Sequence, residues 1–217
     1  MLYIVATPIG NLKDITLRAI ETLKSVDLIA CEDTRHTKIL LDEYGIKTST
    51  TSYFQHNRFA KGEYLLGLLK QGKNIALVSD AGTPGILDPG YHLINLAIEQ
   101  DIPVTAIPGP TAFIDALVLS GKPTHDFIFA GFLPNRTLAR QNCLKELSKQ
   151  KRTIVFYESY HRILATLEDI HKVFAGREIV VARELTKKFE EIKRGPAEEI
   201  LSSFQRQSPR GEFVIVI

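Results

Sequence analysis

Short apolar runs alternate with amphipathic stretches through the first half of the chain. Five runs are rich in β-branched residues and bounded by turn formers, which predicts buried strands; they cover residues 2–6, 26–31, 46–52, 74–79 and 102–107, the third being the weakest. Helical periodicity covers residues 16–24, 34–44, 57–71 and 90–100, with Thr16 as an N-cap and Gly45 and Gly72 at C-terminal caps. Strands that are apolar on both faces and alternate with helices predict a largely parallel sheet with helices on both sides.

A second unit follows a further helix at residues 111–120. The turn formers Gly121-Lys122-Pro123-Thr124 predict a domain boundary, so we expect domains at residues 1–120 and 121–217. In the second domain the pattern predicts strands at 127–132, 153–157, 178–183 and 212–217, and helices at 137–150, 161–174 and 197–205. The expected fold class is α/β, with two α/β domains and a mainly parallel N-terminal sheet.

Composition fits a folded cytoplasmic protein. Of 217 residues, 44% are hydrophobic and 24% charged, and 27 basic against 25 acidic residues leave a net charge of only +2. Cys31 and Cys143 stand far apart, which fits a reducing compartment and excludes a CxxC zinc signature. No apolar run reaches the roughly 20 residues of a membrane helix, and no His, Cys and carboxylate cluster predicts a metal site.

Three glycine- and proline-rich loops follow predicted strands. They are TPIGN at residues 7–11, DAGTPG at 80–85 and PGPT at 108–111. Each alone is also compatible with a plain tight turn, but the carboxyl ends of parallel strands share one edge, where open α/β sheets bind ligands. Asp80 is placed there to accept hydrogen bonds from hydroxyl or amino groups. None of the loops matches GxGxxG, which disfavours a dinucleotide site.

Two charged segments also follow strands. ACEDTRHT at residues 30–37 contains Asp33, Arg35 and His36, and ELTKK at 184–188 contains Glu184 and Lys187. Helix caps, ion pairs and an exposed charged turn are the plain explanations for these segments. Their number of ionisable groups also makes them candidates for catalysis.

Two segments are candidates for binding nucleic acid. Six basic residues and one acid between residues 136 and 152 give a local charge of +5, which favours contact with a phosphate backbone. The basic residues are Arg136, Arg140, Lys145, Lys149, Lys151 and Arg152. Residues 53–59, YFQHNRF, mix aromatic rings with cations, a pattern found where single-stranded RNA is bound by stacking. A solvated helix face explains either segment equally well.

Taken together, the motifs resemble the tetrapyrrole methylase superfamily. The match runs through YIVATPIGNLKDITLRA from Tyr3, ACEDTRHT, SDAGTPGILDPG from Ser79, IPGPTA, FAGFLP, FYES, ARELTKKFEE and RGEFVIVI. Within the superfamily, the motifs resemble most the enzymes that methylate the ribose 2′-oxygen of a cytidine in 16S rRNA, with the rRNA or the assembled small ribosomal subunit as partner.

The resemblance implies a class III S-adenosylmethionine methyltransferase of two α/β domains that works as a homodimer. Carried over by position, the residues that contact S-adenosylmethionine are Ile9, Gly10, Asp80, Thr83, Thr111, Ala112 and Tyr157. Phe54 and Arg58 depart from the family pattern, in which a second His and an acid are usual. The family also extends past RGEFVIVI, so we expect a further carboxyl-terminal piece.

For such a reaction the ribose hydroxyl must lose its proton, or its developing charge must be stabilised. Asp33 and His36, three apart at a helix start, are candidates to share a face, with His36 as base. Glu184 is a candidate proton acceptor, and Lys187 a candidate to offset negative charge, or to act as base if burial lowers its pKa. We expect RNA contacts from Arg35, Arg136, Arg140, Lys149, Lys151 and Arg152.

Two other hypotheses remain at this point. One is a small-molecule or protein methylase of the same fold, of the tetrapyrrole or diphthine type, because fold alone does not determine the substrate. The other is a non-catalytic RNA-binding module. The three loops favour an enzyme, and the charged and basic segments favour an RNA substrate.

Overall fold

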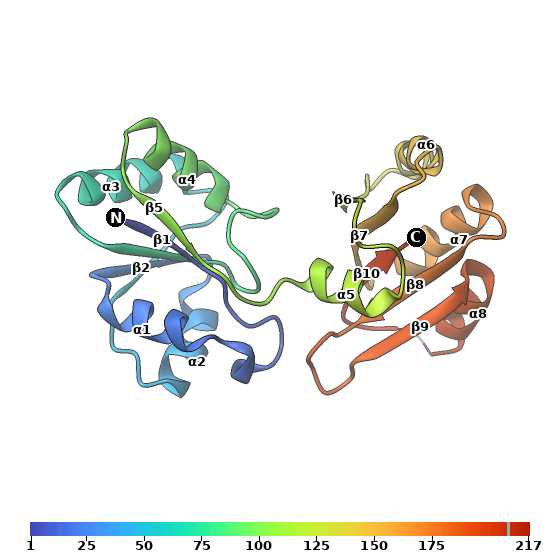
Figure 1. Cartoon of the computed structure of the whole chain (residues 1–217), viewed down its shortest axis with the longest axis horizontal. Coiled ribbons are helices and arrows are strands. Elements are labelled where there is room, and N and C mark those ends of the chain that lie inside the picture. The colour runs from blue at the N-terminus through green and yellow to red at the C-terminus, as the bar shows by residue number, and fades with distance from the viewer. Residues whose placement is uncertain (208) are drawn as a thin grey trace. The chain divides into compact units, whose positions relative to one another are not determined.

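The computed structural model describes residues 1–207 and 209–217, and the chain forms two compact units, Met1–Thr111 and Ala112–Ile217 (Figure 1). The sequence predicts the boundary nine residues later. Helix α5 (Ala112–Ser120) belongs to the second unit because it packs against strands β7 (Thr153–Ser159) and β10 (Glu212–Val216).

The first unit contains a five-stranded sheet in the order β3-β2-β4-β1-β5, and every neighbouring pair is parallel. The strands are β1 (Leu2–Val5), β2 (Leu28–Cys31), β3 (Thr50–Ser52), β4 (Ile75–Val78) and β5 (Val104–Ile107). Each lies inside its predicted range. The parallel sheet expected from apolar runs alternating with helices is therefore confirmed.

Helices cover both faces of this sheet, as Figure 1 shows. One face carries α1 (Leu17–Ser25) and α2 (Thr34–Glu43), and the other carries α3 (Arg58–Lys70) and α4 (Gly90–Glu99). A short 3₁₀ turn, η1 (Leu12–Asp14), precedes α1. The predicted N-cap is confirmed, because Thr16 Oγ1 accepts a hydrogen bond of 3.1 Å from Ala19 N.

The strand order creates a topological switch around β4. The chain leaves β4 toward α4, whereas it leaves both neighbours, β1 and β2, toward α1 and α2 on the opposite face. Loops that leave adjacent strands toward opposite faces open a crevice at the carboxyl edge of a sheet. The loop after β4 is therefore flanked on both sides by loops that turn the other way.

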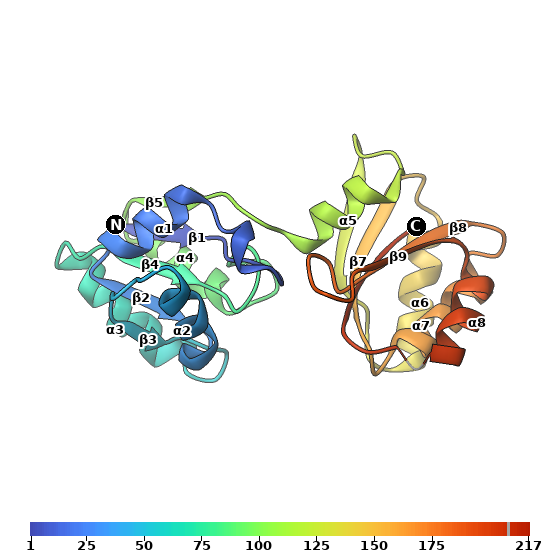
Figure 2. The same ribbon diagram turned by 90° about the horizontal axis from the view of Figure 1, so that it is seen from below.

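The second unit has a mixed sheet in the order β6-β7-β10-β8-β9, in which β6 and β7 are parallel and the other pairs antiparallel. New strands here are β6 (Phe127–Phe132), β8 (Glu178–Arg183) and β9 (Glu191–Pro196). Helices α6 (Thr137–Ser148), α7 (Ile163–Val173) and α8 (Ala197–Gln207) cover one face, and α5 covers the other (Figure 2). The sequence does not predict β9, an edge strand in which polar residues precede Gly195 and Pro196.

A buried ion pair connects α6 to α7 in the second unit. Arg140 and Asp169 are 3% and 2% exposed, and 2.7 Å separates Arg140 Nη2 from Asp169 Oδ2. Gln141 Nε2 donates to the other carboxylate oxygen at 2.7 Å. The prediction that Arg140 contacts RNA is therefore wrong, because its guanidinium is buried and already paired.

Replacing Asp169 should destabilise the second unit strongly. The substitution Asp169→Ala leaves the Arg140 guanidinium buried without its counter-charge, so we expect a loss of about 3–5 kcal/mol in the free energy of unfolding. Equilibrium urea unfolding followed by circular dichroism measures the change.

The matched control is Glu146→Ala, which removes the partner of Lys149 in an exposed ion pair on α6. Exposed pairs contribute about 0–1 kcal/mol. Equal destabilisation by the two substitutions would contradict the structural role assigned to Asp169.

Candidate active site

Hydrogen bonds tie the loops after β1 and β4 to each other. The backbones of Thr7 and Gly82 exchange two bonds, with N···O distances of 2.9 and 3.0 Å, and form an isolated antiparallel bridge. Thr7 Oγ1 also donates to Ser79 O at 3.1 Å. The two glycine- and proline-rich loops therefore form one rigid structure at the switch point of the sheet.

The loop after β5 joins the same structure. The hydroxyl oxygens of Thr83 and Thr111 are 2.7 Å apart. A Cβ added to Gly109 would lie 2.9 Å from Ala6 Cβ, so any side chain at this position would push the two loops apart. Gly82 has a left-handed backbone, with a φ of 81°, which favours glycine at this position. The structure thus brings together the three loops that the sequence places at one edge.

Asp80 connects these loops to the charged segment after β2. Asp33 N donates to Asp80 Oδ1 at 3.1 Å. The ends of the neighbouring strands β2 and β4 are therefore linked. This contact holds the Asp80 carboxylate at the edge where the sequence predicts a ligand.

Glu32 and Asp88 are acidic residues at this edge that the sequence analysis did not select. Burial, followed by the charges of Asp80 and Asp88, raises the pKa of Glu32. Burial also raises the pKa of Asp88, whose carboxylate accepts hydrogen bonds from Gly85 N and Gly90 N. The sequence DPG at residues 88–90 indicates a turn in which Asp88 accepts hydrogen bonds from nearby backbone N–H groups, as Asp commonly does.

Asp33 and Arg35 pair with each other at the start of α2. Asp33 caps the helix by accepting from Arg35 N at 2.8 Å, and its carboxylate also binds the exposed Arg35 guanidinium. The hydrogen bonds from Arg35 lower the pKa of Asp33 to about 2. His36 is exposed in the first turn of the same helix. Asp33 is thus a poor proton acceptor at neutral pH, and its carboxylate is occupied by Arg35.

In the second unit, Lys187 is bound between two carboxylates. Its Nζ lies 3.0 Å from Glu184 Oε1 and 2.8 Å from Glu212 Oε2. Burial alone would lower the pKa of Lys187, but the bonds to Glu212 and Glu184 outweigh it and raise the pKa. The suggested role of Lys187 as a base with a lowered pKa is therefore wrong, because the structure favours its protonated form.

Glu184 holds its loop to the segment before β10. Burial would raise its pKa, but bonds from Glu212 N, at 3.0 Å, and from Lys187 lower it overall. Glu184 and Thr186 have left-handed backbones, with φ of 51° and 64°, which non-glycine residues rarely adopt. Gly211, at φ 101°, leaves room for the Glu184 carboxylate, which a Cβ would meet at 2.5 Å. Strained backbone held by several contacts is typical of functional loops.

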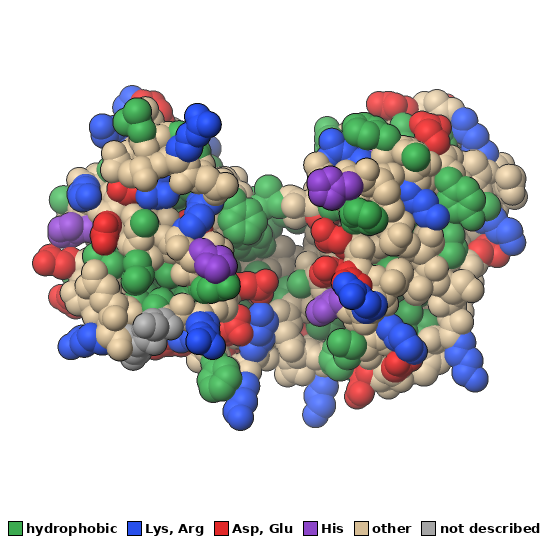
Figure 3. Space-filling model, turned by 180° about the vertical axis from the view of Figure 1, so that it is seen from behind, with side chains coloured by type: hydrophobic (Ala, Val, Ile, Leu, Met, Phe, Trp, Pro, Cys, Tyr) green, Lys and Arg blue, Asp and Glu red, His purple; other side chains and the backbone are tan. Residues whose placement is uncertain are grey.

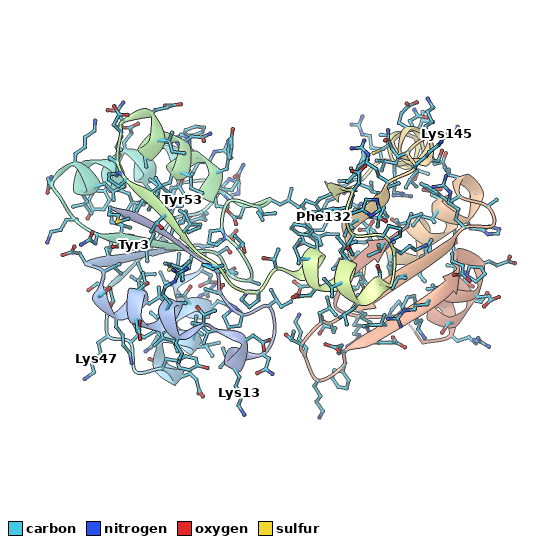
Figure 4. The ribbon with its side chains drawn as sticks, viewed as in Figure 1. Tyr3, Lys13, Lys47, Tyr53, Phe132 and Lys145 are labelled. Carbon is cyan, nitrogen blue, oxygen red and sulfur yellow. The ribbon has the colours of Figure 1, made fainter. Side chains whose placement is uncertain are left out.

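Ala112 and Tyr157, also predicted to contact the cofactor, belong to the second unit. Tyr157 lies in β7 within a group of aromatic rings on the α5 face, and burial raises its pKa. Its ring centre is 5.2 Å from that of Phe129, which in turn stacks on Phe113 at 4.1 Å. Phe132, labelled in Figure 4, packs against Tyr157 and remains 54% exposed. The other five predicted cofactor residues lie in the first unit.

The remaining basic residues of the 136–152 segment lie at the surface. Lys149 pairs with Glu146 at 2.7 Å, and Arg152 approaches Asp126 at 4.0 Å. Lys145, labelled in Figure 4, is exposed on α6. On the face drawn in Figure 3, basic side chains are scattered among acidic ones over both units. Arg136, Lys149, Lys151 and Arg152 are therefore accessible, and Lys149 and Arg152 each have an acidic neighbour.

The described residues contain neither a candidate metal site nor a candidate membrane-spanning helix. Among residues 1–207 and 209–217, no three His, Cys, Asp or Glu side chains are grouped so as to hold a metal ion. No helix in the described part of the chain is long and apolar enough to cross a membrane.

Comparison with known proteins identifies the family. Residues 1–201 match the family model of tetrapyrrole (corrin/porphyrin) methylases. The chain belongs to this family. Curated relatives named ribosomal RNA small subunit methyltransferase I align with the whole chain. They include proteins from Synechocystis sp. (52% identical, 78% of the relative covered), Escherichia coli O157:H7 (50%, 77%) and Thermotoga maritima (48%, 97%).

Solved structures agree on the fold. Uroporphyrin-III C-methyltransferase from Thermus thermophilus superposes with a TM-score of 0.69 at 19% identity, covering 99% of this chain and 93% of that one. Diphthine synthase superposes with a TM-score of 0.77 at 14% identity, covering 100% and 88%. At such low identity the likeness concerns architecture, and the tetrapyrrole-methylase-like α/β fold class is confirmed.

The Glu184 contacts should make stability depend on pH. Because the folded chain lowers the pKa of Glu184, its ionised form is stabilising above the unfolded pKa near 4.3. This contribution is lost as the pH falls through the lower, folded pKa. Glu184→Gln should therefore destabilise the second unit by about 1–3 kcal/mol at pH 7, measured by urea unfolding.

The difference between wild type and Glu184→Gln should shrink in the acidic range below that unfolded pKa. Glu198→Gln, at an exposed position in α8, is the control and should change stability little at either pH. A Glu184→Gln effect that stays constant down to pH 3 would refute the assigned ionised state.

Proposed function

We propose that the chain transfers a methyl group from S-adenosylmethionine to the ribose 2′-oxygen of a cytidine in 16S rRNA near the decoding centre. The observation that supports this most directly is sequence identity of about 50%, over the whole chain, to proteins named ribosomal RNA small subunit methyltransferase I. The joined loops at the switch point of the first sheet supply a site of the right kind.

The residues at this edge suit S-adenosylmethionine. Glycine at positions 82 and 109 leaves backbone, rather than side chains, along the loops, so N–H and C=O groups can approach a nucleoside. The Thr83 and Thr111 hydroxyls and the Asp80 carboxylate add polar groups for hydroxyl, amino or ammonium groups. Ile9 and Gly10 would border the same ligand, and we propose that Ala112 and Tyr157 add contacts. When bound, the cofactor supplies an electrophilic methyl group on its sulfonium.

We propose that the segment after β2 supplies the proton acceptor. A protonated ribose hydroxyl is a poor nucleophile, so a nearby base should accelerate the displacement. The lowered pKa values of Asp33 and Glu184 make both weak bases. Burial and the charges of Asp80 and Asp88 raise the pKa of Glu32, and His36 stands exposed in the first turn of α2. We therefore propose these two side chains as the candidate acceptors.

Exposed cations would hold the RNA. We propose phosphate contacts from Arg35 and from the basic residues of the second unit, which are Arg136, Lys149, Lys151 and Arg152. Exposed ion pairs such as that of Lys149 with Glu146 are weak, so a phosphate can displace the carboxylate. The 16S rRNA or the assembled small subunit is the proposed partner, and the proposed assembly is a cytoplasmic homodimer.

A small-molecule or protein substrate is the competing proposal. Uroporphyrin-III C-methyltransferase and diphthine synthase share the fold, but their identity to this chain is below 20%. A shared fold does not determine a substrate. The relatives near 50% identity carry the name of an rRNA enzyme, which favours RNA.

The function is tested on small subunits from a strain that lacks the protein. The wild-type chain with S-adenosylmethionine should produce 2′-O-methylcytidine, detected by mass spectrometry of digested rRNA.

Asp80→Ala should weaken cofactor binding by about 1–3 kcal/mol, because a ligand polar group is left unpaired, and calorimetry measures the affinity.

Asp42→Ala is the control, since Asp42 forms an exposed pair with Lys38 on α2. Unchanged cofactor affinity in Asp80→Ala would remove Asp80 from the site. Methylation of a tetrapyrrole or a protein, with none of rRNA, would overturn the proposed substrate.

The proton acceptor is tested by single-turnover methylation at saturating rRNA and cofactor. Glu32→Gln or His36→Ala should slow the chemical step by about 10²–10⁴-fold, the usual effect of removing a general base. The rate should rise with pH in wild type, and this rise should vanish in the variant that lacks the base. Glu43→Gln, exposed at the end of α2, is the control. Wild-type rates in both variants would place the base elsewhere.

A further inference from the structure

Aromatic and cationic side chains gather where α3 and α4 begin. The Arg58 guanidinium carbon lies 4.8 Å from the centre of the Phe59 ring, and that ring meets the His92 ring edge-on, 5.0 Å away at 70°. Tyr91 precedes His92 at the start of α4. We call the group of Arg58, Phe59, Tyr91 and His92 the Phe59 surface.

The Phe59 surface lies at the carboxyl edge of the first sheet. Helices α3 and α4 follow β3 and β4, so their first turns stand at the edge that also carries the loops of the proposed cofactor site. The surface and the proposed methyl-transfer site are thus parts of one edge of one compact unit.

Buried contacts hold this surface in place. Tyr53, labelled in Figure 4, is 1% exposed, and its hydroxyl donates to Pro89 O at 3.2 Å. Asn57 closes the turn before α3 by accepting from Phe54 N at 2.8 Å and donating to Ser52 O at 3.2 Å. The loops before α3 and α4 are therefore fixed to each other.

Gly62 permits the contact between Phe59 and His92. A Cβ on Gly62 would lie 3.2 Å from Leu96 and 3.4 Å from His92, tighter than most real contacts. The two helices therefore pack closely beside Phe59, which keeps His92 within reach of the ring.

The rings of the surface are exposed although the core beneath them is well packed. Phe59 is 63% and Tyr91 65% exposed. Residues 54–62 contain Arg58, Lys61 and His56 but no acid, and Glu63 follows them on α3. Asp88, the nearby carboxylate, accepts hydrogen bonds from Gly85 N and Gly90 N. An exposed ring with a guanidinium over it suits a partner that carries both an aromatic base and a negative charge.

We propose that the Phe59 surface binds an unpaired nucleotide of the substrate RNA next to the one that is methylated. The base stacks on Phe59 and on the Arg58 guanidinium, and the adjoining phosphate lies near Arg58. Unpaired bases stack on aromatic rings and on guanidinium planes irrespective of sequence, and cations bind the backbone. This role rests on the proposed RNA substrate and adds a recognition element to it.

Binding of a fluorescent single-stranded RNA carrying the methylated region, measured by anisotropy, tests the proposal. Phe59→Ala should weaken binding about 5- to 150-fold, the range for loss of one base–aromatic stack. Phe59→Trp should retain affinity. Arg58→Ala should lower the slope of log affinity against log salt by about one unit, because one phosphate contact is lost.

Tyr64→Ala is the matched control. Tyr64 is 53% exposed on the same helix and has Lys61 above its ring, but it lies five residues further along, about 140° around the helix from Phe59. It should bind RNA like wild type. In methylation assays, Phe59→Ala should raise KM for small subunits while leaving kcat and calorimetric cofactor affinity near wild type.

Equal weakening by Phe59→Ala and Tyr64→Ala would overturn the proposal, as would wild-type RNA affinity in Phe59→Ala. If Phe59→Ala instead shifts sedimentation from dimer to monomer with RNA affinity unchanged, the surface joins two copies of the chain. Fluorescence anisotropy measures RNA binding whether or not methyl transfer takes place, so it tests this surface separately from the proposed function. A wild-type chain that binds RNA through Phe59 but never methylates it would refute the proposed function and support this surface.

Discussion

The paired backbone bonds between Thr7 and Gly82 are the contact on which the proposed site depends. They close the loops after two adjacent strands upon each other, at the place where the chain departs toward opposite faces of the sheet. The hydroxyl contact of Thr83 with Thr111 adds the loop after β5, and Asp80 adds the segment after β2. Four connections are thereby held in fixed positions, and pre-organised polar groups bind a ligand without losing much entropy on association.

Periodicity predicts most of the fold because burial is a local signal along the chain. The four clear strands of the first unit are apolar on both faces, and their helices have recognisable caps such as Thr16. Strand β9 escapes prediction because an edge strand is half solvated and tolerates Gly195 and Pro196. The unit to which α5 belongs cannot be predicted from local sequence. It depends on packing against β7 and β10, which are distant from α5 in the chain.

Residue types predict where charged groups gather, but their roles follow from partners that spacing does not reveal. Arg140 looks like its surface neighbours in the sequence, and only the fold brings Asp169 from the next helix beside it. Lys187 meets Glu212 from a strand 25 residues later, which raises its pKa instead of lowering it. The pKa of Glu32 is raised by burial in the fold and then by the charges of Asp80 and Asp88, both more than 40 residues away. Glycine-rich loops are easier to predict, because a turn is specified by adjacent residues.

The position of β10 has a consequence for how the protein is made. This strand follows all the others of the second unit in the chain, yet it lies in the middle of the sheet, between β7 and β8. During synthesis from the amino terminus, the first unit can close its sheet once β5 has emerged from the ribosome. In the second unit, β7 and β8 cannot become part of one sheet until β10 has been synthesised, because β10 pairs with both of them. Its apolar faces therefore stay open until the ribosome has delivered Glu212–Val216.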